Sequence, residues 1–139
     1  MERTVVLVKP DAVIRGFIGE VISRFERKGL KVVGCKMMQL KEAILREHYA
    51  HVADQPFFKD LSQFMSSSPV VALCIEGPAA VSLVRTVCGE KHTELGSIRG
   101  DLAPSRSMNI VHSSDSPETA KREIERFFSK DELFDYTKE

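Results

Sequence analysis

A histidine stands where the apolar run of the segment NIVHSSDS (109–116) ends. His112 follows Ile110 and Val111, and hydroxyl side chains and the expected start of a helix come directly after it. Free N–H groups and the dipole at a helix N-terminus favour a bound anion. A neutral imidazole is the major form of histidine at pH 7 and is a nucleophile. His112 is therefore a candidate nucleophile toward a negatively charged group.

Two further side chains could support His112. Ser114 offers a hydroxyl within the same turn, and Glu123 lies two turns into the following helix, on the side able to face the strand. A carboxylate bonded to an imidazole fixes the tautomer of the ring. The alternative is a histidine at the edge of the core whose ring is satisfied by the backbone, which is the commoner role of a lone histidine.

Basic and aromatic residues could supply a site for a phosphate-bearing ligand. Lys9 stands at the exit of the first expected strand, Arg85 in a helix and Arg99 in the loop GSIRGD. Each could be a solvated charge, but arginine in a glycine-flanked loop commonly binds phosphate through its forked donors. Phe57 and Phe58 begin a helix, and such a pair is either core or offers one exposed ring that stacks on a base.

His48 and His51 lie three residues apart in an expected helix, which is half of a zinc site. Neither cysteine nor carboxylate support is evident near them. We interpret the pair as surface histidines and predict no metal ligands in the chain.

The elements that position these residues alternate between strand and helix. Removing a helical hairpin from their order leaves βαββαβ, so we predict an α+β fold: a ferredoxin-like antiparallel sheet with an inserted helical hairpin and a C-terminal helix. The third strand is apolar enough to be central. Strands are expected at 3–9, 30–40, 69–77 and 109–116, helices at 16–29, 41–52, 56–67, 78–89 and 116–129, a loop after residue 9, and a long irregular stretch at 90–108.

Length and composition set the remaining expectations. The 139 residues fit one domain (1–139), and 20 basic residues balance 20 acidic ones, so an anionic ligand must be held by local groups. The balance argues weakly against a nonspecific nucleic-acid binder. Cys35 and Cys74 lie in apolar runs and are expected in the core of a protein from a reducing compartment. Neither a signal peptide nor a membrane span is evident, so we expect a cytoplasmic protein.

Five segments, taken in order, resemble the nucleoside diphosphate kinase family: VKPDAVIRGFIGEVISRFERKGL, EHYAHVADQPFF, SSSPVVALCIEG, GSIRGDL and NIVHSSDS. The resemblance implies an enzyme that transfers the γ-phosphoryl group of a nucleoside triphosphate, usually ATP, to a nucleoside diphosphate by ping-pong through a phosphohistidine. The alternative is a ferredoxin-like nucleotide-binding or regulatory module without turnover, which would have no use for a histidine paired with a carboxylate.

The resemblance also implies roles for individual residues. His112 matches the nucleophile, and others match groups that bind the ribose, grip the phosphates, stack on the base or position the histidine. Mg²⁺ would arrive with the nucleotide, and Asp115 could touch its shell through water. The family forms tetramers or hexamers built from dimers. The implied catalytic set is His112, Glu123, Ser114, Lys9 and Tyr49, and the implied nucleotide-binding set is Lys9, Phe57, Arg85, Arg99 and Asn109.

The loop before Arg99 departs from the pattern of the family. It is a few residues shorter, and Leu95 stands where the family usually has proline. Lys91 stands at the place of a phosphate-contacting threonine, with Thr93 two residues further on, and either could take over that contact. Because this loop contributes to subunit contacts in the family, its change bears on the assembly.

Overall fold

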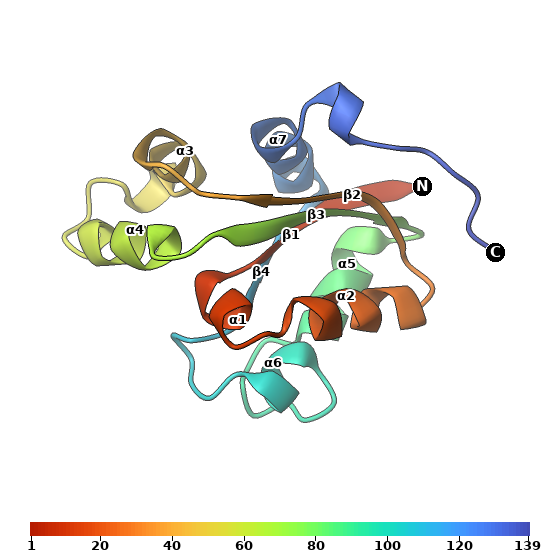
Figure 1. Ribbon diagram of the computed structural model, residues 1–139, viewed down its shortest axis with the longest axis horizontal. Helices are drawn as coiled ribbons and strands as arrows, with labels where there is room; N and C mark the ends of the chain where they lie inside the picture. The colour runs from red at the N-terminus through yellow and green to blue at the C-terminus, as the bar shows by residue number, and fades with distance from the viewer.

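The computed structural model describes residues 1–139 and places four strands in one antiparallel sheet (Figure 1). The strand order is β2-β3-β1-β4, and each neighbouring pair runs antiparallel. This is the predicted ferredoxin-like arrangement, with β1 and β3 in the centre. The strands are β1 (Glu2–Val8), β2 (Lys31–Met38), β3 (Val70–Gly77) and β4 (Val111–Ser113).

Every expected helix is present, including the hairpin between β2 and β3. Two short helices lie where the sequence predicted irregular structure. One begins directly after β1 at Pro10, whose fixed φ suits the first helical position. The other is capped by Ser97, whose hydroxyl accepts from the Gly100 N–H at 3.0 Å. The helices are α1 (Pro10–Ile14), α2 (Ile18–Arg27), α3 (Glu42–His48), α4 (Phe58–Ser66), α5 (Ala80–Cys88), α6 (Ile98–Leu102) and α7 (Pro117–Phe127), with 3-10 turns η1 (Ala50–Val52) and η2 (Lys130–Glu132).

Apolar clusters cover both faces of the sheet, because the side chains of a strand alternate between its faces. Val6 and Val8 of β1 belong to the cluster beneath α2 and α5, whereas Val5 and Leu7 belong to the cluster beneath α3 and α7. Figure 1 shows these helix pairs on opposite sides of the sheet. The central strands are therefore rigid supports for residues at their ends. No helix combines the length and apolar character needed to cross a bilayer.

Strand β4 is shorter than the sequence predicted, since it pairs with β1 over only three residues. Just before it, Ile110 has a φ of 76°, a left-handed conformation that is a genuine outlier for a β-branched residue. Two bonds to the start of α1 hold this turn. The Ile110 N–H donates to Oδ2 of buried Asp11 at 3.1 Å, and the Ile110 carbonyl accepts from the Lys9 N–H at 2.9 Å. Helix α1, which the sequence analysis did not predict, thus fixes the backbone that leads into β4.

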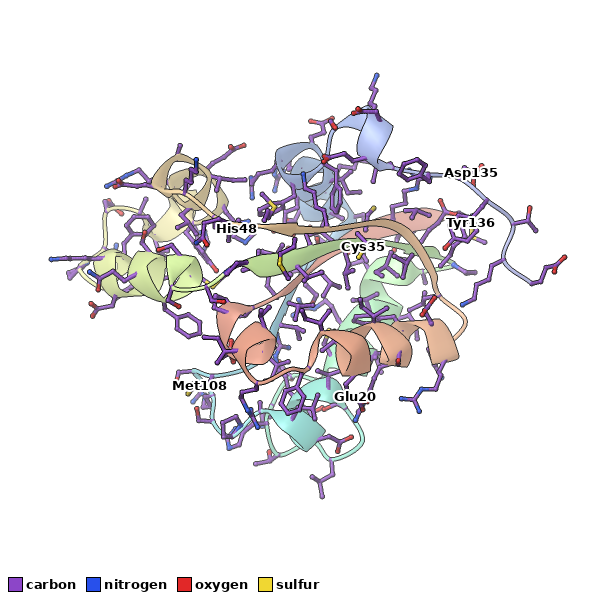
Figure 2. The ribbon with its side chains drawn as sticks, in the orientation of Figure 1. Glu20, Cys35, His48, Met108, Asp135 and Tyr136 are labelled. Carbon is purple, nitrogen blue, oxygen red and sulfur yellow. The ribbon has the colours of Figure 1, made fainter.

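The cysteine expectations are half correct. Cys74, on central β3, is buried, whereas Cys35 is exposed. Cys35 lies on β2, which forms one edge of the sheet and whose second half alternates between exposed and partly buried residues (Figure 2). An apolar run on an edge strand therefore does not place every residue in the core.

Replacing Asp11 with alanine is expected to lower the free energy of unfolding. The buried N–H of Ile110 would lose its acceptor, which costs ~1–3 kcal/mol. Urea unfolding measures the change, with Asp54→Ala, an exposed carboxylate in the α3–α4 connection, as the control. Equal unfolding midpoints for the wild type and the Asp11 variant would contradict this account of the turn.

Candidate active site

His112 and Glu123 are joined by hydrogen bonds between β4 and α7. His112 Nε2 lies 3.1 Å from each carboxylate oxygen of Glu123, and Ser114 Oγ donates to Glu123 Oε1 at 2.6 Å. The Val5 N–H donates in turn to Ser114 Oγ at 3.3 Å, which ties the group to β1. The structure therefore brings Ser114 and Glu123 together with His112, as the sequence analysis expected, and the ring is not satisfied by the backbone.

The local structure of β4 and α7 explains why His112 and Glu123 lie side by side. His112 is the middle residue of β4 and pairs opposite Leu7 of β1. The chain then turns into α7, at the expected position, which begins where Ser116 Oγ accepts from the Thr119 N–H at 3.1 Å. Because α7 packs back against β1, Glu123 in its second turn points at the strand that the chain has just left.

The charge on Glu123 is held in place by its partners. The side chain is only 4% exposed, so burial disfavours the carboxylate, but hydrogen bonds from His112 and Ser114 hold its pKa below the usual value. An ionised carboxylate only accepts, so His112 carries its proton on Nε2. Because the pKa is lowered in the fold, the stability from these contacts is complete above the unfolded pKa of about 4.3 and is lost as pH falls through the folded value.

A cavity of about 750 Å³ opens beside His112, whose side chain is 26% exposed. Its walls come from the exit of β1, the α3–α4 connection, α5, the segment 99–113 and α7, so residues far apart in sequence share one space. Seven of the predicted site residues line it: Lys9, Tyr49, Arg85, Arg99, Asn109, His112 and Glu123.

Lys9 and Asn109 form a polar pair in this cavity. Lys9 Nζ donates to Asn109 Oδ1 at 2.6 Å and so connects the end of β1 to the residue before the strained turn. Burial lowers the pKa of Lys9, although the carboxylate of Asp11 opposes the change. A cation held in a partly desolvated place interacts with an anion more strongly than one in open water.

Arg99 stabilises the loop as well as facing the cavity. Its guanidinium donates to the backbone carbonyls of Gly89, Asn109 and Val111, so three of its five N–H donors are used and two remain for a ligand. Burial lowers its pKa. Arg85 has a single weak bond, to the Ser113 carbonyl at 3.4 Å, and its other donors are free.

The predicted aromatic residues have different positions. The ring of Tyr49 lies edge-on to His48 with 4.7 Å between centroids, and burial raises the pKa of its phenol to about 12. Phe58 is 5% exposed and belongs to the core, whereas Phe57 is 52% exposed and lies outside the cavity lining. Of the pair at the start of α4, Phe57 is therefore the ring available to a ligand.

A second cavity, of about 510 Å³, adjoins the first and shares Arg99 and Asn109 with it. Lys91 and Thr93 both line it, together with Arg106. The shortened loop therefore presents both candidates for the phosphate contact to this second cavity.

His48 is the residue that the sequence analysis missed. The prediction of a surface pair is wrong for His48, because its side chain is 2% exposed, whereas His51 is exposed. Figure 2 places His48 between α3 and the sheet, and its ring lies edge-on to His112 with 4.6 Å between centroids. Its spacing of three residues from apolar Leu45 on the same helix face is the signal that could have indicated burial.

His48, His112 and Glu123 offer three ligand atoms within 4.8 Å of one another, which could hold a metal ion. Those atoms already have partners, however. Arg126 Nη1 donates to His48 Nδ1 at 2.8 Å, and both oxygens of Glu123 face His112. A cation there would lie beside a guanidinium, so the electrostatics favour the hydrogen-bonded network over a metal centre.

Comparison with known proteins agrees with this geometry. A family model described as "Nucleoside diphosphate kinase" matches residues 2–133. The chain belongs to the nucleoside diphosphate kinase family. It is 50% identical over 139 residues to the nucleoside diphosphate kinase of Parabacteroides distasonis, covering 98% of this chain and 91% of that protein. It is also 50% identical to that of Pyrococcus abyssi, covering 97% and 89%.

Solved structures of the family share the fold as well. A nucleoside diphosphate kinase family protein from Babesia bovis has a TM-score of 0.95 at 42% identity, covering 99% of this chain and 95% of the other. A halophilic nucleoside diphosphate kinase from Halobacterium salinarum, in complex with CDP, has a TM-score of 0.93 at 44% identity, covering 99% and 93%. The predicted fold and family are confirmed, and these matches support nucleoside diphosphate kinase function and do not favour the alternative of a binding module without turnover.

Replacing Glu123 with glutamine is expected to lower the kcat of the kinase. A neutral amide accepts a weaker hydrogen bond from His112 than a carboxylate does, and a difference of ~1–2 kcal/mol corresponds to roughly tenfold in rate. Steady-state kinetics measure it, with the exposed Glu125→Gln on the same helix as the matched control. An unchanged kcat in the Glu123 variant would show that the carboxylate does not support His112.

Proposed function

We propose that the kinase works by ping-pong through a phosphohistidine at His112, taking the γ-phosphoryl group of a nucleoside triphosphate, usually ATP, and passing it to a nucleoside diphosphate. One observation carries this proposal. Nε2 of His112 is engaged by Glu123, whereas Nδ1 has no hydrogen bond and the ring borders the cavity. Nδ1 therefore offers an uncommitted lone pair to a phosphorus atom.

The first half-reaction needs no proton transfer. The lone pair of His112 Nδ1 attacks the γ-phosphorus in line, the bond from phosphorus to the β,γ-bridging oxygen breaks, and the nucleoside diphosphate leaves with that electron pair. The imidazole gains positive charge, which the Nε2–H bond to Glu123 stabilises. In the second half-reaction a β-phosphate oxygen of the acceptor attacks, the P–N bond breaks and neutral His112 is restored.

Cationic and polar groups of the cavity would hold the nucleotide. Arg85 and Arg99 have unused N–H donors that suit phosphate oxygens. Lys9 and Asn109 would bind the ribose hydroxyls, with Lys9 also reaching the phosphates. Stacking on a ring without base-edge hydrogen bonds discriminates poorly among bases, which suits a broad acceptor range. Phe57 would provide that ring, and Tyr49 would help to position the sugar and phosphates.

Mg²⁺ would enter with the nucleotide. Asp115 fits an indirect contact with it, because its exposed carboxylate lines the cavity and has no hydrogen-bond or ion-pair partner. Mg²⁺ usually keeps several waters and binds through one or two carboxylates and substrate phosphates. When bound, the ion would offset the negative charge of the phosphates, and Asp115 would orient one water of its shell.

We also propose that residues 1–139 act as one cytoplasmic domain and assemble into a homo-oligomer, a tetramer or hexamer built from dimers. The family match over residues 2–133 supports a single functional unit. The CDP in the Halobacterium salinarum complex supports nucleoside diphosphates as ligands of this chain. The shortened loop before Arg99 makes the count of subunits a property to measure by light scattering.

Incubation with γ-labelled ATP is expected to give an acid-labile, base-stable phosphoprotein that transfers its label to a deoxynucleoside diphosphate. His112→Ala should abolish both labelling and turnover, because the attacking nitrogen is lost. His51→Ala, which removes an exposed histidine of η1, should leave the labelling intact. Labelling that survives in the His112 variant, or nucleotide binding without turnover in the wild type, would overturn the proposal.

A further inference from the structure

Glu123 faces two imidazoles, although the reaction described above uses only one. His48 Nδ1 lies 3.7 Å from Glu123 Oε2, and the two histidine rings meet edge to face at 80°. His48 is therefore close enough to become a third hydrogen-bond donor to the carboxylate, beside His112 and Ser114. Each further donor weakens the stabilisation that the carboxylate gives to charge on His112.

Arg126 decides which nitrogen of His48 carries the proton. Arg126 lies one turn after Glu123 on α7, is 12% exposed, and donates from Nη1 to His48 Nδ1 at 2.8 Å. A guanidinium has no acceptor, so His48 Nδ1 must be the unprotonated nitrogen and Nε2 must carry the proton. The nitrogen of His48 that faces Glu123 is therefore unable to donate to it.

The surroundings fix this arrangement. Glu47 Oε1 lies 3.4 Å from Arg126 Nε, so this carboxylate also attracts the guanidinium and helps to hold it beside His48. His48 is neutral as well, because burial above all, together with the neighbouring His112, lowers its pKa to about 3. A neutral ring with its proton on Nε2 packs against His112 without adding charge.

We propose that Arg126 is a positioning residue for phosphoryl transfer, which acts through His48: by keeping His48 Nδ1 an acceptor, it prevents His48 from competing with His112 and Ser114 for the carboxylate of Glu123. The inference rests on the proposed role of His112 as nucleophile. Without Arg126, the proton of His48 would move to Nδ1, and His48 would compete with His112 for Glu123.

The tautomer can be measured directly. Long-range ¹H–¹⁵N spectra of the wild-type protein with ¹⁵N-labelled histidine are expected to show His48 protonated on Nε2 only. In Arg126→Met the proton should move to Nδ1, and in Arg126→Lys, which keeps a cationic donor, it should stay on Nε2. A wild-type spectrum with the proton on Nδ1 overturns the inference, whether or not any variant folds.

The rate provides the second measurement. Arg126→Met is expected to slow single-turnover phosphorylation by ATP about tenfold, with a smaller change in KM for ATP. Lys121→Met, which removes the same charge from an exposed site on α7, should leave the rate unchanged.

The His48→Phe background isolates the route of the effect. Phenylalanine keeps an aromatic edge beside His112 but cannot donate a hydrogen bond to Glu123. Adding Arg126→Met to the His48→Phe variant should therefore change the single-turnover rate less than about twofold, which is within the error of a double-mutant cycle. A full loss in this background would mean that Arg126 acts directly, and it would overturn the inference. If the wild type itself acquires no label, the proposed function fails instead.

Discussion

The site depends on one buried carboxylate. Glu123 is 4% exposed and is held ionised because His112 and Ser114 donate hydrogen bonds to it. Burying such a charge without these partners would cost on the order of several kcal/mol. Glu123 therefore needs both hydrogen-bond donors to remain charged, and His112 needs the carboxylate to hold its ring. This mutual requirement fixes the orientation of the histidine and leaves one ring nitrogen for the ligand.

The fold places His112 beside that carboxylate by means of a strained turn and a short strand. Strand β4 has only three residues, and the turn before it places Ile110 in a left-handed conformation that costs ~1–3 kcal/mol. Asp11 accepts from the N–H of Ile110, and the guanidinium of Arg99 donates to the carbonyls of Asn109 and Val111 on either side of it. The strain therefore lies next to the proposed nucleophile, in a segment supported by a sheet that is covered on both faces. A rigid backbone at this place would let one set of donors serve both proposed half-reactions.

Sequence reasoning predicted what is local or periodic. The antiparallel sheet and the helical hairpin follow from alternation and helical spacing, and the family motifs indicated seven of the residues that line the cavity. It failed where a contact joins distant residues. Nothing near His48 in the sequence indicates Arg126, which is 78 positions away. The N–H of Ile110 in the αL turn finds its acceptor on Asp11, 99 positions earlier. Cys35 was misplaced for a similar reason, since its exposure depends on which strand forms the edge of the sheet.

The position of the phosphoryl group on the imidazole tests the central claim most directly. Alkaline digestion of the labelled protein, followed by separation of the two phosphohistidine isomers, reports which nitrogen attacked. Because Glu123 engages Nε2, the account predicts that the label lies on Nδ1 of His112. Label on Nε2 would mean that the carboxylate does not hold the ring in the observed orientation during the reaction, and would contradict the account.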